Sequence, residues 1–491
     1  MRIMIVGGGS AGWITANVLN AVLNGDTTPS FEIILLEAPD IPIIGVGEAT
    51  VPSIRRTLQT IGIPEREFMR GCEATFKNAI RFVDWNPDAQ YDHPFDRRQR
   101  PETDSKVRSW LTSAAQTPFD KTFSLLSHLS DHNRAPKAVG WPDYGSTFPY
   151  AYHLDAAMLA NMLANWGVAR GIKHKKAFVR DVEIGADSNI LAVTTDTEER
   201  LSADLYVDCT GFRARLIGEA LGVSKQHYEK NCLCDRAATM RVPYDIHRLE
   251  RLRPYTLATA RAAGWSWDIN LTSRRGLGYV YSSAFLSEDE AETELRAFEG
   301  AHTDNLEVGH IRFETSKRVK SWTGNCVAVG LADGFLEPLE SSGLYMIEFA
   351  AQALSELIPG YRLAPSQTAS HFNCLTQGLY EEVLDFINLH YVTSLRRDTP
   401  FWMAATDQSA VLDSLSDRLE LWRTRPPSDL DFALNQRLFS LESYEFILFG
   451  MGYCAYQNHA LDAGNDNDIS SLVDKCLAKL PTHEEWLRLS L

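Results

Sequence analysis

Short apolar runs alternate with amphipathic stretches along the first 320 residues of the chain. Residues 2–6 and 31–36 have the composition of buried strands, and residues 13–23 between them have a helical spacing of apolar positions. In residues 174–206 and 236–320, apolar and polar positions alternate in several short segments, as in strands with one buried face. We therefore predict an α/β (α+β) fold in which a second sheet, built from these two stretches, lies over the first.

Helical spacing of apolar residues recurs later and dominates the C-terminal part of the chain. The predicted helices comprise residues 64–76, 152–168, 344–357, 367–395, 406–424 and 429–450. Residues 99–148 are polar and carry only short patterns, which favour loops with some helix. The C-terminal region is thus predicted to be helical and distinct from the part that precedes it.

The first strand runs into a glycine-rich turn, Gly7-x-Gly9-x-x-Gly12. In a dinucleotide-binding turn the first glycine permits the tight bend and the second lets the backbone approach a pyrophosphate, while the third lets the helix pack on the strand. Glu37, at the end of the second strand, is placed to bind ribose hydroxyls. A glycine-rich turn without a ligand is the alternative, but this order of strand, turn, helix and acid favours a dinucleotide.

Later stretches have the pattern of further contacts with the same cofactor. Residues 205–212 and 327–333 each run from an apolar strand into a glycine and carry an acid. Gly45 and Gly47 mark a backbone that passes close to another group, which is either the cofactor or a plain turn. These patterns alone leave both FAD and NAD open.

The stretch 325–344 combines a possible anion site with two acids. A buried strand leads into Ser342 and Gly343, where an apolar helix begins, and Glu337 and Glu340 lie in the turn before it. Backbone N–H groups of small residues at a helix start, together with the helix dipole, favour a bound anion. We predict that a cofactor and a reaction meet here.

Other candidate side chains have simpler alternative explanations. Lys77 stands among apolar residues, where most lysines extend to solvent but a buried one becomes a reactive or hydrogen-bonding group. Trp265 and Trp267 alternate along a strand and therefore share one face, either as a pocket wall or as ordinary packing. His93 and Phe95 belong to an aromatic loop that is open to the same two interpretations.

Composition narrows the class of protein. The 491 residues are 44% hydrophobic and 23% charged, which is typical of a soluble globular protein with a core large enough for two or three domains. The net charge of −16 argues against nucleic-acid or anionic-membrane partners. The eight cysteines have no metal-ligand spacing, so we expect no metal site and a reducing, cytoplasmic location.

Four motifs together resemble the flavin-dependent halogenases, the tryptophan-halogenase-like branch of the flavin monooxygenase fold. They are Gly7-Gly-Gly-Ser10-Ala11-Gly12-Trp13, Gly45-Val-Gly-Glu48-Ala49-Thr50, Phe76-Lys77-x-Ala-Ile-x-Phe82 and Phe335-Leu-Glu-Pro-Leu-Glu-Ser-Ser-Gly343. The first is shared with many flavoproteins, whereas the last is highly specific. The resemblance covers nearly the whole chain and implies an FAD-binding, Rossmann-like fold of the flavin monooxygenase type.

The resemblance also implies a reaction. Reduced FAD (FADH2), supplied by a separate flavin reductase, and O2 convert chloride or bromide to hypohalous acid. This oxidant is relayed to Lys77 and halogenates an indole-type aromatic ring with help from Glu340. Halide corresponds to the backbone of Ser342 and Gly343. The implied substrate contacts are His93, Phe95, Trp265 and Trp267, and the implied cofactor contacts are Gly7, Gly9, Ser10, Ala11, Gly12, Glu37, Gly47, Glu48, Ala49, Asp333, Gly343 and Leu344.

The sequence departs from the family pattern at Asn270, which replaces the proline of a motif that begins at Trp265. The motif is associated with halogenation rather than oxygenation, so a flavin-dependent aromatic monooxygenase is kept as an alternative, and a non-catalytic flavin-binding protein as a weaker one. The C-terminal region has no match to the segment that holds the amino-acid part of tryptophan. We therefore favour indole or a simple substituted indole over free tryptophan.

The domain organisation follows from the resemblance. Residues 1–365 are expected to form the FAD-binding halogenase module, with an inserted substrate-side sheet at about 80–205 and 225–320. Residues 366–491 are expected to form a helical region that completes the substrate pocket. The expected oligomeric state is a monomer or a homodimer.

Overall fold

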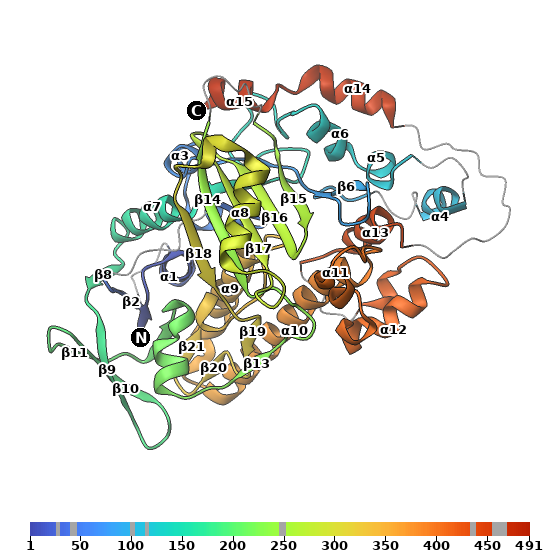
Figure 1. The fold of residues 1–491 in the computed structure, drawn as a ribbon. Helices are drawn as coiled ribbons and strands as arrows, with labels where there is room; N and C mark the ends of the chain where they lie inside the picture. Colours follow the sequence, from blue (N-terminus) through green and yellow to red (C-terminus); the bar gives the residue numbers. More distant parts are fainter. Residues whose placement is uncertain are drawn as a thin grey trace.

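The computed structural model describes residues 1–25, 30–39, 47–98, 104–112, 117–244, 252–432, 438–453 and 469–491. Gly45, in the second predicted glycine loop, lies outside these residues. Within them the chain forms a six-stranded sheet, a seven-stranded sheet and three small three-stranded sheets (Figure 1). None of the helices in the described ranges is long and apolar enough to cross a bilayer.

The six-stranded sheet is formed by β20 (Trp322–Thr323), β21 (Cys326–Ala328), β12 (Leu205–Asp208), β1 (Arg2–Val6), β2 (Glu32–Glu37) and β8 (Lys173–Lys176), in that order. All neighbours are parallel except β20 and β21. Along β1, Ile3 and Ile5 join the core on one face, whereas Met4 and Val6 join the core on the other. Because both faces are covered, the strand is apolar throughout, which confirms the prediction for residues 2–6.

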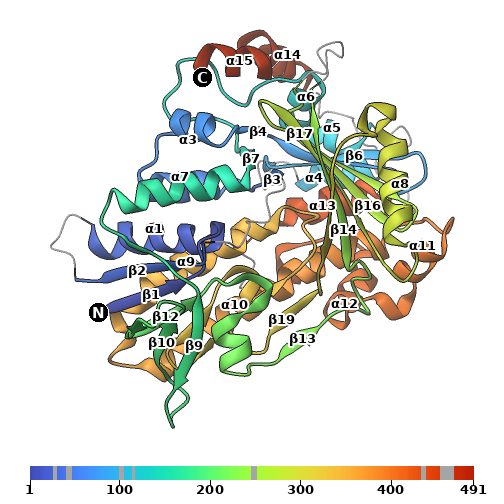
Figure 2. The same ribbon diagram turned by 60° about the vertical axis from the view of Figure 1, so that its left-hand side comes forward.

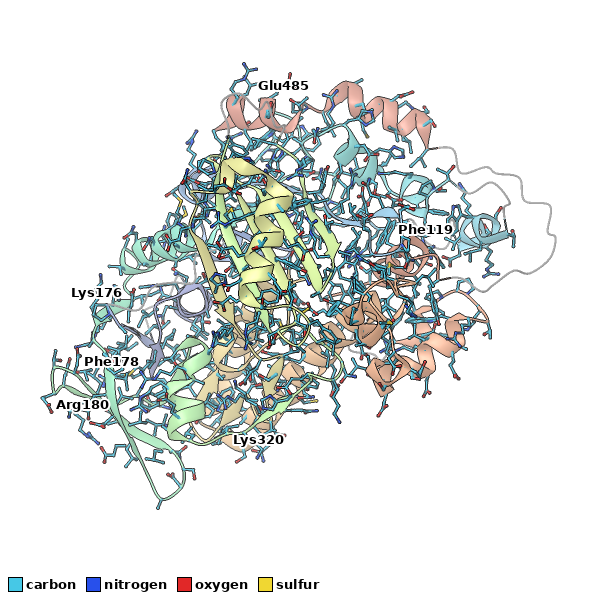
Figure 3. The ribbon with its side chains drawn as sticks, in the orientation of Figure 1. Phe119, Lys176, Phe178, Arg180, Lys320 and Glu485 are labelled. Carbon is cyan, nitrogen blue, oxygen red and sulfur yellow. The ribbon has the colours of Figure 1, made fainter. Side chains whose placement is uncertain are left out.

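Helices α1 (Ser10–Asn24), α7 (Ala156–Val168) and α9 (Ser342–Tyr361) pack together on one face of this sheet (Figure 2). The short helix η2 (Arg215–Ala220) and a small antiparallel sheet cover the other face. That small sheet consists of β9 (Val179–Ile184), β10 (Ile190–Thr195) and β11 (Arg200–Leu201). Lys176, Phe178 and Arg180 lie where the chain leaves β8 for this small sheet (Figure 3).

The expectation that residues 174–206 join the overlying sheet is therefore wrong. β8 and β12 belong to the six-stranded sheet, and β9 to β11 pair only with one another. Alternation of apolar and polar residues reports which face of a strand is buried, but it carries no information about the neighbouring strand.

The seven-stranded sheet is the predicted overlying layer. Its order is β18 (Val308–Arg312), β14 (Arg236–Pro243), β17 (Arg274–Tyr281), β16 (Gly264–Asn270), β15 (Tyr255–Arg261), β5 (Ala79–Val83) and β6 (Gln90–Pro94). Only the β15–β5 pair is parallel. Helix α8 (Glu288–Glu299) covers one of its faces (Figure 1).

A small sheet of β3 (Gly47–Ala49), β7 (Ala151–Asp155) and β4 (Thr75–Lys77) corrects two predicted helix boundaries. Helix α3 (Glu65–Gly71) ends before Phe76, which lies in β4 rather than in a helix. The helix predicted to open at residue 152 begins at Ala156, and Asp155 caps it by accepting from the backbone N–H groups of Ala157 and Met158. The apolar residues that suggested helix belong to buried strands.

A second small sheet, β13 (Lys225–His227), β19 (Ser316–Arg318) and β22 (Gly334–Phe335), leads into the turn before α9. The remaining helices before it are α2 (Ile54–Ile61), α4 (Asp104–Thr112), α5 (Phe119–Phe123) and α6 (Leu125–Asp131). Helices α4 to α6 lie in the stretch predicted as loop with some helix.

The C-terminal region is helical, as predicted. It contains α10 (Pro365–Val392), α11 (Pro400–Ala405), α12 (Asp413–Trp422), α13 (Leu441–Gly450), α14 (Ser470–Lys479) and α15 (His483–Ser490). Phe119 of α5 packs against Phe446 and Phe449 of α13 (Figure 3). His483 of α15 accepts the Phe76 N–H at 3.0 Å. The region thus packs closely on earlier segments, and the division at residue 365 stays a prediction.

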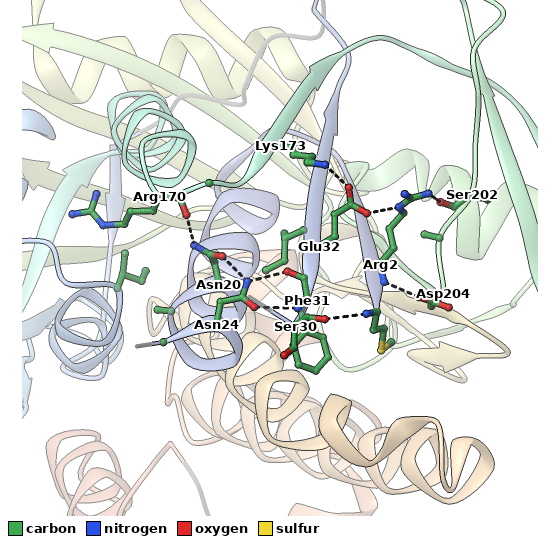
Figure 4. A pocket seen from close by; sticks show the side chains of 17 residues that line it. Arg2, Asn20, Asn24, Ser30, Phe31, Glu32, Arg170, Lys173, Ser202 and Asp204 are labelled. Carbon is green, nitrogen blue, oxygen red and sulfur yellow. Dashed lines mark hydrogen bonds and ion pairs between the residues drawn. The ribbon is translucent and has the colours of Figure 1, made fainter. Parts of the chain in front are cut away.

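A charged hollow of about 1110 Å³ lies at the amino ends of β1 and β2 (Figure 4). Most of its charges are already paired, since Arg2 and Lys173 both contact Glu32, and Asp204 contacts Arg362. Ligands of open parallel sheets bind at the opposite, carboxyl edge. The search for a site therefore turns to that edge.

Candidate active site

The glycine-rich turn sits at the carboxyl end of β1 and begins helix α1. Gly7 has φ +119°, and a Cβ there would lie 2.1 Å from the Cys209 carbonyl oxygen. A Cβ on Gly12 would lie 1.9 Å from the Gly7 carbonyl oxygen, whereas one on Gly9 would meet nothing within 4 Å. Gly7 and Gly12 are therefore required by the fold itself, and Gly9 leaves open space at the start of α1, as a pyrophosphate needs.

Two acids stand beside this turn. Glu37, at the end of β2, pairs with His174 Nε2 at 2.7 Å and lies so close to Gly8 that a Cβ there would be 2.3 Å from its carboxyl carbon. Asp333 is buried, and its Oδ1 has no hydrogen-bond partner among the described residues. Burial raises the pKa of Asp333 to about 6, although Lys317 opposes the shift. A buried oxygen without a partner is what a bound hydroxyl-rich cofactor would satisfy.

The late stretch around Asp333 returns to the glycine-rich turn as predicted. A Cβ on Gly330 would lie 2.9 Å from the Cβ of Ala11. The middle stretch behaves differently, because Asp208 accepts the N–H groups of Leu216 and Ile217 and so caps η2 rather than facing open space. The cradle beside Ser10 and Ala11 therefore has the open and polar features that fit FAD.

The strand β3 brings Glu48 and Ala49, both half-buried, alongside β7. A Cβ on Gly47 would lie 2.7 Å from Ile269 Cδ1 of the seven-stranded sheet. Gly47 is thus demanded by packing between two sheets, in addition to any contact with a cofactor. β3 thus packs directly against the seven-stranded sheet.

The turn before α9 carries the acids that the sequence singled out. Its N–H at Ser341 donates to the Pro338 carbonyl at 3.0 Å, and Ser341 adopts the left-handed conformation with φ +59°. Helix α9 begins at Ser342, which is buried, while a Cβ on Gly343 would meet nothing within 4 Å. The helix start at Gly343 is therefore open, and Leu344 is buried behind it.

Lys77 is completely buried at the end of β4. Its Nζ donates to the Thr50 carbonyl at 3.0 Å and to Ser341 Oγ at 2.8 Å, and it lies 5.1 Å from the centre of the Phe95 ring. Burial lowers the pKa of Lys77 to about 7, although the Glu340 carboxylate opposes the shift. Of the two interpretations of Lys77, the structure therefore shows the buried, hydrogen-bonding one.

Glu340 is clamped between two histidines. Its Oε2 lies 2.8 Å from His93 Nδ1, and its Oε1 lies 2.9 Å from His390 Nε2. Burial by itself raises the pKa of Glu340, but His93 and His390 outweigh this effect and hold the pKa at about 2. His390 Nδ1 also lies 2.7 Å from the Phe386 carbonyl oxygen, which fixes the orientation of the ring. Glu340 is therefore a carboxylate at neutral pH.

A cavity of about 920 Å³ opens onto Glu340. Its wall includes His93, Phe95, Pro52 and Ser53, and Tyr345 of α9. Apolar and basic residues from two other parts of the chain complete it: Arg97, Lys106, Phe123, Leu125 and Phe148 from residues 96–149, and Phe439, Ile469 and Leu472 from the C-terminal region. His93 and Phe95, the predicted substrate contacts, thus both line a cavity that reaches Glu340.

Neither tryptophan lines this wall, so their contact with the substrate stays a prediction. Trp265 is buried, and its Nε1 donates to Glu337 Oε2 at 2.9 Å. Trp267 covers Gly278, where a Cβ would lie 2.0 Å from its ring. Alternation correctly put both rings on one face, 6.1 Å apart, but that face packs inside the protein.

Asn270, the departure from the family motif, is also buried away from the cavity. Its Oδ1 accepts from Arg253, and its Nδ2 donates to Tyr244 Oη at 3.1 Å. The amide is therefore fully engaged in a local polar network.

Sequence reasoning missed Thr50, Ser341 and His390 as partners of the candidate acid and base. Thr50 and Ser341 both lie inside motifs that carried the resemblance, so their place in the site had a signal. His390 lies near the end of α10, 50 residues after Glu340, and nothing in the local pattern of α10 distinguishes it. Only packing of that helix against the turn brings it into the site.

A family model described as tryptophan halogenase matches residues 2–466. Tryptophan 6-halogenase SttH of Streptomyces toxytricini is 35% identical over 473 residues, covering 92% of this chain and 89% of that protein. A tryptophan halogenase structure from Shewanella frigidimarina has a TM-score of 0.94 at 34% identity, covering 100% of this chain and 97% of that one. BrvH, a flavin-dependent halogenase from Brevundimonas sp. BAL3, has a TM-score of 0.88 at 32% identity, covering 100% and 99%. The chain belongs to the tryptophan halogenase family.

Membership in the tryptophan halogenase family makes the chain an enzyme of the flavin-dependent halogenase type, with reduced FAD and halide as its cofactors. Like the family, it uses an aromatic substrate, O2 and a flavin reductase. The predicted fold class, family and cofactors are confirmed, and the monooxygenase alternative is not favoured. The roles of individual residues remain proposals.

The glycine geometry separates folding from cofactor binding. Gly12→Ala should lower the free energy of unfolding of the FAD-free protein by about 2 kcal/mol or more, because its Cβ would clash with backbone. Gly9→Ser should leave that free energy unchanged, since serine is a good N-cap and φ at this position is −79°. It should nevertheless weaken FAD binding. Urea unfolding and titration with FAD measure the two effects, and normal FAD affinity in Gly9→Ser would contradict this placement of the cofactor.

Burial of Lys77 should make stability depend on pH. Between about pH 7 and the ordinary lysine pKa of 10.5, the unfolded chain holds a proton at Lys77 that the folded chain has released. Stability relative to Lys77→Met should therefore rise with pH, by on the order of 2 kcal/mol between pH 7.5 and 9.5. Urea unfolding of both proteins at these pH values is the measurement. A difference that stays constant would mean that the folded protein keeps Lys77 protonated.

Proposed function

We propose that this enzyme halogenates an indole-type ring with chloride or bromide, and that Lys77 and Glu340 carry out the transfer. The observation that supports this proposal most strongly is the hydrogen bond from Lys77 to Ser341, the residue next to Glu340. The surroundings lower the pKa of the Lys77 amine to about 7 and the pKa of the Glu340 carboxyl to about 2, and these two values suit two different tasks.

The cofactor cradle and the halide site would bring together the reactants that form the oxidant. Reduced FAD together with O2 supplies the oxidising equivalents that convert halide to hypohalous acid. We propose that Gly7, Gly9, Ser10, Ala11 and Gly12 hold the dinucleotide. The remaining proposed FAD contacts are Glu37, Gly47, Glu48, Ala49, Asp333, Gly343 and Leu344. The N–H groups of Ser342 and Gly343 at the open start of α9 would hold the halide.

Lys77 would receive and aim the halogen. A neutral amine binds hypohalous acid by a hydrogen bond or displaces water from it to form a haloamine, and a pKa of about 7 keeps a large neutral fraction at neutral pH. The hydrogen bonds to Thr50 and Ser341 fix the direction of the amine. Holding a promiscuous oxidant at one point gives the reaction both its rate and its selectivity.

Glu340 would complete the substitution. When the ring attacks the halogen, one ring carbon becomes cationic and must lose its proton. A carboxylate stabilises that cation and then accepts the proton. The two histidine contacts keep Glu340 ionised and fixed in position, while His93 and Phe95 on the cavity wall would flank the ring.

The cavity favours a substrate without a free ammonium group. Among the described wall residues the carboxylates are Asp96 and Glu340, and both are engaged. Asp96 accepts from Ser124 Oγ at 2.7 Å and from the Leu126 N–H at 3.2 Å. Much of the remaining wall is apolar. These contacts support indole or a simple substituted indole over free tryptophan.

We also propose a cytoplasmic monomer or homodimer without nucleic-acid or membrane partners.

Lys77→Ala should abolish halogenation while FAD still binds, because the amine that aims the halogen is lost but the cradle is intact. We expect brominated indole to fall by at least about a hundredfold. The enzyme is incubated with reductase, FAD, NADH, indole and bromide, and mass spectrometry detects the bromine isotope doublet. Normal product from this variant would remove Lys77 from the mechanism. A hydroxylated product from wild type, formed without halide, would instead support oxygen insertion.

Glu340→Gln should slow product formation by about a hundredfold or more while bromide oxidation continues. The amide keeps the shape of the side chain but cannot take the ring proton. Oxidised bromide captured by a dimedone-type trap measures the first half of the reaction, and brominated indole measures the second. Equal loss of both products would place Glu340 in oxidant formation instead.

A further inference from the structure

A second glutamate of the turn, Glu337, is as buried as Glu340 but has no part in the chemistry described so far. Its Oε2 accepts from Trp265 Nε1 at 2.9 Å and from Tyr391 Oη at 2.8 Å. Its Oε1 has no hydrogen-bond partner among the described residues. Burial raises the pKa of Glu337 to about 7, although the bonds from Trp265 and Tyr391 oppose the shift. Burying a carboxyl group costs free energy, which the hydrogen bonds from Trp265 and Tyr391 offset.

Helix α10 holds both glutamates of the turn through neighbouring residues. His390 contacts Glu340 at 2.9 Å, and Tyr391 donates to Glu337 at 2.8 Å. Consecutive residues on a helix point about 100° apart, so the two side chains reach different carboxylates of the turn. The turn is thereby fixed to α10 at two separate points.

Two further elements complete the attachment of the turn. Trp265 reaches Glu337 from β16 of the seven-stranded sheet, and Lys77 reaches Ser341 from β4. Ser341 itself has a left-handed backbone, which costs a non-glycine residue roughly 1–2 kcal/mol. A turn with that conformation persists only where its surroundings determine it.

We propose that Trp265, Glu337 and Tyr391 are positioning residues whose hydrogen bonds hold the turn so that Glu340 and Ser341 stay aligned with Lys77. This inference rests on the proposed roles of Lys77 and Glu340. The three residues then set the share of hypohalous acid that ends as halogenated product rather than escaping. Trp265 belongs to the predicted tryptophan motif, and this role accounts for it without a contact to the substrate.

Removing one donor at a time tests the proposal. Trp265→Phe and Tyr391→Phe each keep an aromatic ring and delete one hydrogen bond to Glu337. Each should lower kcat for brominated indole by roughly tenfold, since misplacement of about 1 Å costs up to a hundredfold. The KM for indole and the affinity for FAD should stay within about twofold of wild type. The oxidised bromide caught by a dimedone-type trap should rise as product falls.

Matched controls separate positioning from a general loss of structure. Trp322→Phe deletes an indole hydrogen bond to the Gly324 carbonyl in the six-stranded sheet instead of one to Glu337, and it should keep the wild-type kcat and trapped bromide. Glu337→Gln keeps a carbonyl oxygen that accepts from both donors and should retain a higher kcat than Glu337→Leu, which has none. Thermal unfolding shows whether each variant is folded, and Tyr391→Phe provides the test if Trp265→Phe fails to fold.

Each outcome decides one question. Folded Trp265→Phe and Tyr391→Phe with wild-type kcat and trapped bromide would overturn the proposal. Parallel loss of product and trapped bromide would also overturn it, because the defect would then lie in oxidant formation. A wild-type enzyme that gives no brominated indole would refute the proposed function itself, and that result is seen before any variant is made.

Discussion

One hydrogen bond, from Lys77 Nζ to Ser341 Oγ at 2.8 Å, joins the two parts of the molecule on which the proposed chemistry depends. Lys77 comes from β4 of the small sheet that β4 forms with β7 and β3, and Ser341 comes from the turn that starts α9. Ser341 has Glu340 before it and Ser342 after it, so one left-handed residue separates the carboxylate from the proposed halide site. Any shift of this residue would move both sites at once.

Lys77 and Glu340 are both buried, but their different hydrogen-bond partners affect their pKa values differently. Lys77 loses its solvent and gains only neutral oxygen partners at close range, so the pKa of its amine falls to about 7. Glu340 is equally buried but receives two imidazole contacts, so the pKa of its carboxyl falls to about 2. The same buried environment thus holds an amine with a large neutral fraction at neutral pH and a carboxylate that stays ionised. The difference lies in the hydrogen-bond partners and not in the depth of burial.

Residues of distant elements hold both glutamates of the turn before α9. His390 and Tyr391 of α10 hold Glu340 and Glu337, and Trp265 holds Glu337 from the seven-stranded sheet. Helix α10 belongs to the C-terminal region, so residues far from the glycine-rich turn hold the turn that leads to the proposed halide site. The C-terminal helices therefore contribute to the site through support as well as through the cavity wall.

The sequence by itself determined the elements whose signal is local. The apolar strand 2–6 and the glycine-rich turn are encoded by residues that are neighbours in the chain, and so is the turn that carries Glu340 and Ser341. Tertiary structure decided the rest. Phe76 lies in a strand because it pairs with β7. Trp265 reaches Glu337 from β16, and His390 reaches Glu340 from α10. Periodicity records which side of an element is buried, but the partner on that side comes from distant residues, and no local pattern contains it.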